Sequence, residues 1–158
     1  MKNLNNLPLR LGVGIVLLNK KNEIFVGKRI DNPSNFWQMP QGGVDKNENF
    51  LHAAKRELEE ETGIKSVKLI KELNELLTYD LPDSLLGKIW KGKYRGQKQK
   101  WFIMKFTGEN AEININTKNP EFLEWKWIKS SMLPDVAVSF KINIYKKLME
   151  ELNFLKLN

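Results

Sequence analysis

The segment from Asn49 to Thr62 is the strongest helix signal in the chain, and it constrains everything around it. Asn49 is a favoured N-cap residue, and Gly63 fits the left-handed position at which many helices end. On a helical wheel the apolar residues of this segment fall on one face. They are Phe50, Ala53, Ala54 and Leu58. This face must pack against another element, and strand-like segments on both sides of the helix indicate a sheet.

The same face becomes acidic in the last turn of this helix. Glu57, Glu60 and Glu61 project to the side of the apolar residues, whereas Glu59 points away. Carboxylates four residues apart repel each other, and burying an unpaired charge is costly. Arg56 can neutralise Glu60, and the remaining charge indicates a bound cation. Oxygen donors without nearby Cys or His suit Mg²⁺ or Mn²⁺, and the alternative is an exposed charge run on a solvated surface.

The rest of the chain predicts a mixed sheet and a second helix. A hairpin is expected from strands over Gly12–Asn19 and Glu23–Arg29, joined by the turn 20–22. The further strand-like segments are Val67–Tyr79, Gln99–Phe106 and Trp125–Ile128. The segments expected to be irregular are the loop 31–36, the turn 41–43 and the connection 81–97. With a final helix over Ser139–Asn153, the fold class is α+β, in a single domain over residues 1–158.

Composition narrows the partners and the compartment. There are 26 Lys and Arg against 19 Asp and Glu, a net charge of +7, which suits polyanionic partners such as nucleic acid or polyphosphates. Compositional drift on a solvated surface is the alternative. The absence of Cys excludes disulfides and thiolate metal sites. The apolar run Leu11–Leu18 is too short to span a bilayer and indicates a buried strand, so we expect a cytoplasmic protein without a membrane partner.

Residues 42–64 resemble the signature of the Nudix hydrolases, G-x5-E-x7-R-E-U-x-E-E-x-G-U, where U is a bulky aliphatic residue. Its specified places are filled by Gly42, Glu48, Arg56, Glu57, Leu58, Glu60, Glu61, Gly63 and Ile64. A chance match is on the order of one in ten million from average residue usage. The segments LRLGVGIVL, FWQMPQGG, GQKQKWF, NPEFLEWKW and VSFK are similar to the bacterial RNA 5′-pyrophosphohydrolase branch, which overlaps with the dinucleoside polyphosphate hydrolases. Lys46 and Asn47 depart from the Pro-Gly turn of many relatives, which affects the loop and not the chemistry.

The resemblance implies an α/β/α sandwich with a mixed β-sheet, in which the signature forms a central loop–helix–loop. It also implies a metal site that holds more than one Mg²⁺ or Mn²⁺ ion. The implied metal ligands are the carbonyl of Gly42 and the carboxylates of Glu57, Glu60, Glu61 and Glu121. We expect Glu60 to be the general base, with Glu57 or Glu121 as alternatives, and Arg56 to orient the glutamates. Glu48 has either a structural role or a metal contact.

The implied reaction converts 5′-triphosphorylated RNA to 5′-monophosphorylated RNA with release of pyrophosphate. The basic candidates for holding phosphates and the RNA backbone are Arg10, Arg29, Lys98 and Lys141. Phe140 is the first choice for stacking on a base and Tyr79 the second. The alternatives are a diadenosine tetra- or pentaphosphate hydrolase and a non-catalytic nucleotide- or RNA-binding module. The intact carboxylate set argues against the module. We expect a monomer with no obligate protein partner.

Overall fold

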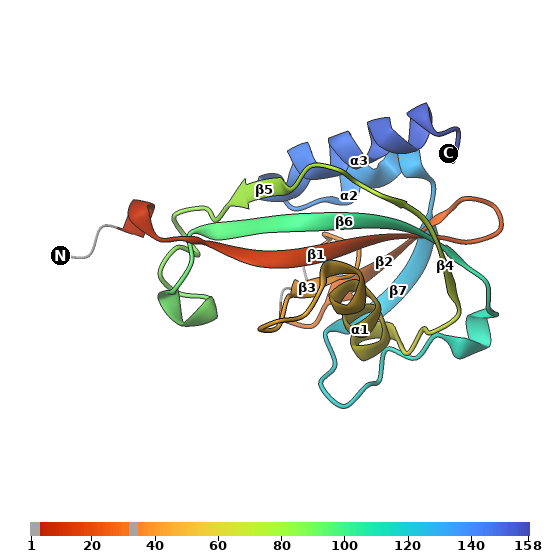
Figure 1. Cartoon of the computed structure of the whole chain (residues 1–158), viewed down its shortest axis with the longest axis horizontal. Helices are drawn as coiled ribbons and strands as arrows, with labels where there is room; N and C mark the ends of the chain where they lie inside the picture. Colours follow the sequence, from red (N-terminus) through yellow and green to blue (C-terminus); the bar gives the residue numbers. More distant parts are fainter. Residues whose placement is uncertain (1–3, 32–34) are drawn as a thin grey trace.

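The computed structural model describes residues 4–31 and 35–158, in which seven strands form one sheet (Figure 1). The strands are β1 (Leu9–Leu18), β2 (Ile24–Arg29), β3 (Gln41–Gly43), β4 (Val67–Glu72), β5 (Leu77–Asp80), β6 (Gly96–Phe106) and β7 (Phe122–Ile128). Their order is β4-β6-β1-β2-β7, with β3 paired to β1 and β5 paired to β6. β1 and β6 run parallel, from Leu9 opposite Gly96 to Leu18 opposite Lys105, and the other pairs are antiparallel. The sheet is therefore mixed, as predicted.

Two helices of 13 residues cover opposite faces of this sheet, α1 (Phe50–Thr62) and α3 (Ile142–Phe154) (Figure 1). The shorter helical segments are α2 (Leu133–Val136) and the 3₁₀ turns Leu4–Asn6, Trp90–Gly92, Asn110–Glu112, Ser130–Met132 and Ser139–Lys141. The ends of α1 follow its local signals. The side chain of Asn49 accepts a hydrogen bond from the His52 N–H at 2.8 Å, and Gly63 is left-handed, with φ of 72°. No helix in the described ranges has the length and apolarity needed to cross a bilayer.

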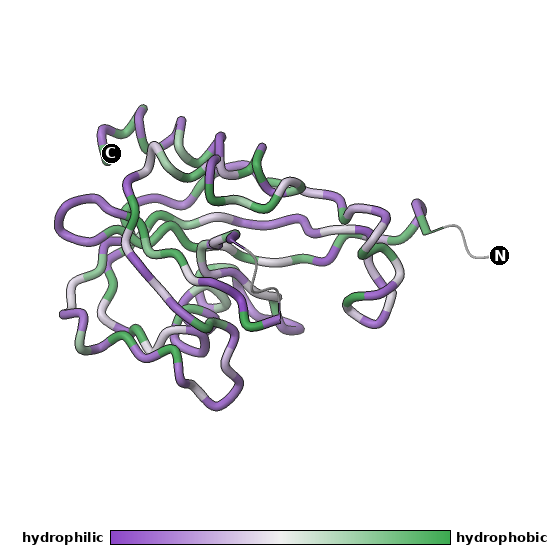
Figure 2. Tube along the Cα trace, turned by 180° about the vertical axis from the view of Figure 1, so that it is seen from behind, coloured by the Kyte–Doolittle hydropathy of each residue, from purple (hydrophilic) through white to green (hydrophobic). Residues whose placement is uncertain are grey.

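Each face of the sheet carries its own hydrophobic core. Successive side chains of a strand point to opposite faces, so Ile15 of β1 packs in the core beneath α1 while Val16 packs in the core beneath α3. β1 and the centre of β6 read as continuous apolar runs because they are covered on both faces. α3 turns its hydrophobic residues toward the sheet and its hydrophilic residues away (Figure 2).

The predicted elements are confirmed, but several of their limits differ, including the earlier starts of β1 at Leu9 and of β7 at Phe122. The predicted turn 41–43 is the strand β3, which pairs with β1, and the predicted strand 67–79 is two strands, β4 and β5. β6 begins at Gly96, and the last helix begins at Ile142 after a 3₁₀ turn. The predicted loop 31–36 includes residues 32–34, which lie outside the described ranges.

The difference at 41–43 has a steric reason. A Cβ atom on Gly42 would lie 2.0 Å from the carboxyl carbon of Glu57, so β3 approaches α1 more closely than any residue with a side chain would allow. The glycines that suggested a turn therefore allow a strand to lie against the acidic end of the helix.

Candidate active site

The glutamates at the end of α1 lie at different depths. Glu61 is buried, with 5% of its surface exposed, and the side chain of Glu57 is 15% exposed. The side chain of Glu60 is 58% exposed, so the expectation that it is buried with the other two is wrong. The helical wheel gives its direction correctly, but its side chain extends along the helix surface toward Arg56, four residues earlier.

Arg56 connects the carboxylates to one another and to the loop before the helix. Its Nε and Nη2 donate to the two carboxylate oxygens of Glu48 at 2.8 and 2.9 Å. Its Nη1 lies 3.0 Å from Oε1 of Glu57 and 3.2 Å from Oε2 of Glu60. Nη2 also donates to the carbonyl of Gly43 at 2.9 Å. Arg56 therefore contacts Glu48 and Glu57 as well as Glu60, and it fixes the position of Glu57.

Glu48 has the structural role that the sequence left as one of two alternatives. Besides its two bonds from Arg56, it accepts a hydrogen bond from the backbone N–H of Asp45 at 3.0 Å and lies 2.7 Å from Nδ1 of His52. Its hydrogen bonds with Arg56 lower the pKa of Glu48 to about 2. Glu48 is thus a fixed anion that holds the loop and Arg56 in place.

A buried carboxylate oxygen of Glu61 that lacks a hydrogen-bond partner in the described part of the chain indicates a metal site. Glu61 accepts a hydrogen bond from the backbone of Gln41, but its Oε2 is buried and has no hydrogen-bond partner among the described residues. Burial raises the pKa of Glu61 well above its usual range, and the charges of Glu57 and Glu121 raise it further, while Arg29 opposes them. A carboxylate oxygen in this situation lacks the compensation that a buried charge requires. The oxygen donors gathered here fit a hard divalent cation.

The site as described is not a preassembled metal cage. In the ranges that the structure covers, no group of three or more His, Cys, Asp or Glu side chains is already arranged to hold an ion. The guanidinium of Arg56 contacts carboxylate oxygens of both Glu57 and Glu60. Burial raises the pKa of Glu57 and Arg56 partly offsets this, so an ion would have to compete with an existing ion pair.

Gly42 and Glu121 complete the predicted metal set. Gly42 lies against Glu57, but its carbonyl oxygen is directed toward β1, 2.8 Å from the position of a Cβ atom on Gly12. Glu121 is half exposed and immediately precedes β7, and its Oε2 lies 3.9 Å from Nη2 of Arg29. Its backbone carbonyl accepts a hydrogen bond from Ile30 at 3.0 Å, which brings this distant part of the chain beside β2.

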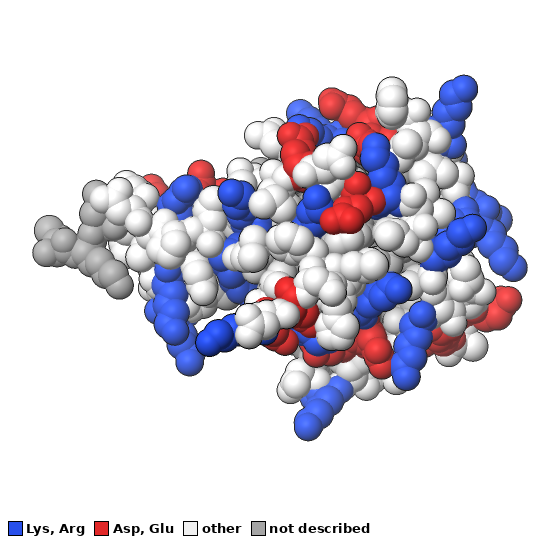
Figure 3. Space-filling model, viewed as in Figure 1, with Lys and Arg blue, Asp and Glu red and all other residues white. Residues whose placement is uncertain are grey.

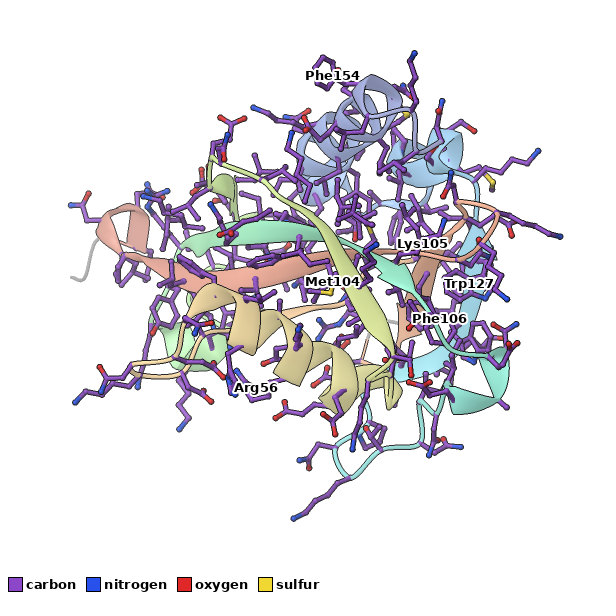
Figure 4. All side chains as sticks on the ribbon, turned by 45° about the vertical axis from the view of Figure 1, so that its right-hand side comes forward. Arg56, Met104, Lys105, Phe106, Trp127 and Phe154 are labelled. Carbon is purple, nitrogen blue, oxygen red and sulfur yellow. The ribbon has the colours of Figure 1, made fainter. Side chains whose placement is uncertain are left out.

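These groups open into one cavity of about 830 Å³, here called the carboxylate cavity. Its acidic lining consists of Glu57, Glu59, Glu60, Glu61 and Glu121, and its basic lining consists of Arg10, Arg29, Arg56 and Lys118. A lining that carries both signs of charge suits a ligand that carries both negative phosphates and divalent cations. Figure 4 shows Arg56 on the side of α1 away from α3.

A second cavity of about 600 Å³, here called the aromatic cavity, adjoins the first. Phe140 lies in its wall, 5.5 Å from the ring of Tyr79, which is buried and has its pKa raised to about 12 by burial. Lys141 is also buried, with Nζ 5.4 Å from the Tyr79 ring and 3.3 Å from Oε1 of Gln38. Burial, with a smaller contribution from Arg29, lowers the pKa of Lys141 to about 7.

The structure brings most of the predicted substrate-binding residues together. Arg29, Gln41 and Trp90 line both cavities, so the two cavities are adjacent. Lys98 is the exception among the described candidates, because it lines neither cavity. Its neighbour Gln97 lines the carboxylate cavity, and alternate residues of a strand point to opposite faces.

The lining residues that the sequence interpretation missed include Gln41, Gln97 and Trp90. Gln41 and Gln97 are buried polar side chains within motifs that were already noted, and Trp90 lies in the connection expected to be irregular. A tryptophan between lysines in a loop was a signal for Trp90, since such a residue has no strand pattern that would place it in the core.

Comparison with known proteins agrees with this architecture. The NUDIX domain family matches residues 8–148. An RNA pyrophosphohydrolase of Pelagibacter ubique is 65% identical over 146 residues, which cover 92% of each chain. An RNA pyrophosphohydrolase of Orientia tsutsugamushi is 45% identical over 157 residues, which cover 99% of this chain and 98% of the relative.

Two solved structures share the fold at low sequence identity. The E. coli dihydroneopterin triphosphate pyrophosphohydrolase superimposes with a TM-score of 0.71 at 20% identity, covering 91% of this chain and 99% of its own. The C. elegans Ap4A hydrolase gives 0.66 at 22% identity, covering 92% and 98%. These two similarities confirm the predicted fold class. The family match over residues 8–148 and the two relatives above show that the chain belongs to the NUDIX domain family.

Proposed function

We propose that this chain, as one domain over residues 1–158, is an RNA pyrophosphohydrolase that releases pyrophosphate from 5′-triphosphorylated RNA. The observation that carries the proposal is the adjacency of the two cavities, which share Arg29, Gln41 and Trp90 in their walls. A ligand with a polyphosphate at one end and nucleotides at the other can occupy both at once. The relatives of 65% and 45% identity, which are named for this activity, support the same assignment.

The carboxylate cavity would hold the divalent ions, which we propose to be Mg²⁺ or Mn²⁺ and more than one in number. The proposed ligands are Glu57, Glu60, Glu61, Glu121 and the carbonyl of Gly42. The unpartnered oxygen of Glu61 supports this set, and the direction of the Gly42 carbonyl makes it the weakest member. When bound, such ions neutralise phosphate oxygens and lower the pKa of a coordinated water.

Glu60 is the proposed general base. It is the most exposed of the three helix glutamates, so a water molecule can reach its carboxylate. Its carboxylate accepts a hydrogen bond from Arg56, which orients it toward the site. The water attacks phosphorus, its proton passes to Glu60, and the bond between the α- and β-phosphates breaks, so that pyrophosphate leaves the RNA. Glu57 and Glu121 remain alternatives for this role, and Arg56 orients the glutamates.

Substrate contacts divide between the two cavities. Arg10 and Arg29 line the carboxylate cavity and would contact the phosphates. Phe140 would stack on a base in the aromatic cavity, with the buried ring of Tyr79 supporting it. Lys141 would contact the RNA backbone from the same wall. Lys98 is not among the described residues that line either cavity, so it would contact only RNA that extends over the outer surface.

The test compares triphosphorylated RNA, diadenosine tetraphosphate and a nucleoside triphosphate as substrates of the same preparation with Mg²⁺. We expect the highest kcat/KM on RNA, with 5′-monophosphorylated RNA and pyrophosphate as products. Salt should inhibit the RNA reaction more steeply than the nucleotide reaction, because a longer polyanion releases more counterions on binding. Faster cleavage of diadenosine tetraphosphate with equal salt slopes would favour a dinucleoside polyphosphate hydrolase. RNA binding without any turnover would favour a binding module.

A further inference from the structure

Trp90 occupies the junction between the two cavities. It lines both of them, whereas Phe140, Tyr79 and Lys141 line only the aromatic cavity. Its ring is half-buried and packs edge-on against Tyr94, with ring centroids 6.2 Å apart. A flat aromatic surface therefore stands at the place where a polyphosphate in the first cavity would continue into nucleotides in the second.

The backbone around Trp90 is held in an uncommon conformation. Trp90 and Lys91 both have positive φ, 51° and 57°, in the left-handed region that residues other than glycine rarely adopt. The neighbouring backbone is fixed by hydrogen bonds from Gly92 N–H to the Ile89 carbonyl at 2.9 Å and from Lys93 N–H to the Trp90 carbonyl at 3.2 Å. Consecutive left-handed residues persist only where the surroundings enforce them, and they concentrate at binding and catalytic sites.

Trp90 also contacts the proposed phosphate-binding residue Arg10. The guanidinium carbon of Arg10 lies 5.4 Å from the centre of the Trp90 ring. On its other side, Nη2 of Arg10 lies 2.3 Å from the position of a Cβ atom on Gly43, so the guanidinium packs directly over this glycine. The indole and Arg10 thus form one continuous part of the cavity wall, with an aromatic surface beside a cation.

The surrounding surface is basic. Lys91 and Lys93 follow Trp90 and are exposed, and Lys88 and Arg95 lie in the same segment. Lys and Arg predominate at this end of the molecule, beside the start of β1 (Figures 1 and 3). A surface of this kind suits the sugar–phosphate chain of a nucleic acid that leaves the cavity.

We propose that the indole of Trp90 stacks on the base of the 5′-terminal nucleotide, the one attached to the triphosphate, while the next base enters the aromatic cavity. This inference rests on the proposed function. It follows from position, because the first base must lie nearer the phosphates than the second, and Trp90 is the aromatic residue that borders both cavities among those described. Stacking on a ring tolerates any base, so this contact adds affinity without sequence preference.

The experiment uses two triphosphorylated RNAs that differ only in whether the 5′-terminal ribose carries a base or is abasic. The parent, Trp90→Ala and Trp90→Phe are compared on both RNAs. Phe154→Ala is the matched control, because Phe154 is an aromatic residue, 79% exposed, at the end of α3, which covers the face of the sheet opposite α1 (Figure 4). Trp90→Leu provides a bulky non-aromatic variant if the alanine variant unfolds, and melting temperatures identify that case.

On the RNA with a complete first nucleotide, Trp90→Ala should lower kcat/KM about tenfold, mainly through KM, and Trp90→Phe should retain most of the activity. On the abasic RNA the same variants should match the parent within about twofold, since the stacking partner is already absent. Equal losses on both RNAs would overturn the proposal and assign Trp90 to the support of Arg10 or of the fold. An unchanged Trp90→Ala would overturn it as well.

Binding of the same two RNAs in chelator supplies a readout without turnover. The Trp90→Ala variant should lose affinity for the complete RNA and not for the abasic one. If the parent fails to hydrolyse triphosphorylated RNA, the proposed function is wrong, whereas an active parent with no difference between the two RNAs contradicts only the role of Trp90.

Discussion

Helices α1 and α3 have the same length and cover opposite faces of one sheet, but they bury different side chains. α3 buries Ile144, Tyr145, Leu148 and Leu152 along its whole length. α1 buries Ala53, Ala54 and Leu58 in its first turns and then Glu61 and Thr62 in its last. In α3 every inward position contributes hydrophobic burial, whereas the last turn of α1 places an uncompensated carboxylate where an apolar side chain would stabilise the fold.

The difference shows where each helix contributes to function. α1 contributes with its C-terminal turn, which borders the carboxylate cavity. α3 contributes through the 3₁₀ turn before it, Ser139–Lys141, which places Phe140 and Lys141 in the aromatic cavity. Tyr145, in the first turn of α3, also lines the aromatic cavity, and no described residue of α3 after it lines either cavity. We therefore expect mutations in α1 to affect chemistry and mutations in the middle of α3 to affect stability.

The largest difference between an effect on activity and an effect on stability should come from Glu60→Gln at the end of α1. This change keeps the size of the side chain but removes the proton acceptor, and loss of a general base costs about 10²–10⁴-fold. The fold should be unaffected because the side chain is 58% exposed. Glu75→Gln is the control, since Glu75 is 59% exposed and is also paired, with Lys147. Activity of Glu60→Gln within a few-fold of the parent, measured on triphosphorylated RNA, would show that another residue is the base.

Leu148→Ala should give the opposite result in α3. Leu148 is fully buried, and removal of a buried leucine side chain costs about 2–5 kcal/mol of unfolding free energy. The kcat at a temperature well below the transition should equal that of the parent. Phe154→Ala, at the exposed end of the same helix, should change stability by less than about 0.5 kcal/mol. A large loss of kcat in folded Leu148→Ala would mean that α3 transmits a constraint to the cavities.

The sequence predicted α1 to the residue because its limits are set by local groups. Asn49 caps the first turn by accepting a hydrogen bond from the His52 N–H, and Gly63 ends the helix in a left-handed conformation. Both signals involve residues close in sequence, so they can be recognised without knowing the fold. β3 was mistaken for a turn because its pairing with β1 joins segments about thirty residues apart in sequence. Glycine there has a role in packing and not in chain reversal.

The directions of the glutamate side chains in the site could be predicted from the sequence, but the extent of their burial could not. The helical wheel placed Glu57 and Glu61 on the buried side, which is confirmed, but it could not place Glu60 at the surface, since depth depends on where the neighbouring strands end. Glu121 was found only through the resemblance, because its position beside Arg29 depends on the pairing of β2 with β7. Trp90 was missed for the same kind of reason, as a cavity wall made from distant segments leaves no periodic pattern.

Divalent ions should offset the free-energy cost of the buried Glu61 carboxylate, which distinguishes α1 from α3. Adding Mg²⁺ or Mn²⁺ should raise the melting temperature. At an ion concentration of 100 times the dissociation constant, the unfolding free energy should rise by about 2.7 kcal/mol. A chelator should stop turnover. Glu61→Gln should lose most of this shift, because it removes the buried unpartnered charge. Glu75→Gln should keep it. The same ion-induced shift in Glu61→Gln and the parent would mean that the ion binds elsewhere.

Phe140→Ala tests whether the turn before α3 has a role in binding. Losing a stacked base costs about 1–3 kcal/mol, so kcat/KM on triphosphorylated RNA should fall by roughly tenfold or more. The ion-induced rise in melting temperature should be unchanged, because Phe140 lines only the aromatic cavity. Phe154→Ala serves as the exposed aromatic control. If Phe140→Ala hydrolyses RNA as fast as the parent, its ring belongs to the core and the aromatic cavity does not receive a base.

The smallest effect should be a pH dependence that arises from Lys141. Its pKa of about 7 in the folded protein lies below the ordinary lysine value of 10.5, so the folded protein loses this charge as the pH rises through 7 while the unfolded chain keeps it. The unfolded chain therefore binds more protons between about pH 7 and 10.5, and the unfolding free energy should rise with pH across this window.

Substrate affinity should change in the opposite sense, since an uncharged amine of Lys141 no longer attracts RNA phosphates, and KM should increase a few-fold between about pH 6 and 8. Lys141→Met should remove both dependences, because methionine fills a similar space without a charge, whereas Lys146→Met, at an exposed position of α3, should retain them. Identical pH profiles for the parent and Lys141→Met would show that Lys141 keeps its charge throughout, and the turn before α3 would then contribute packing without a titrating group.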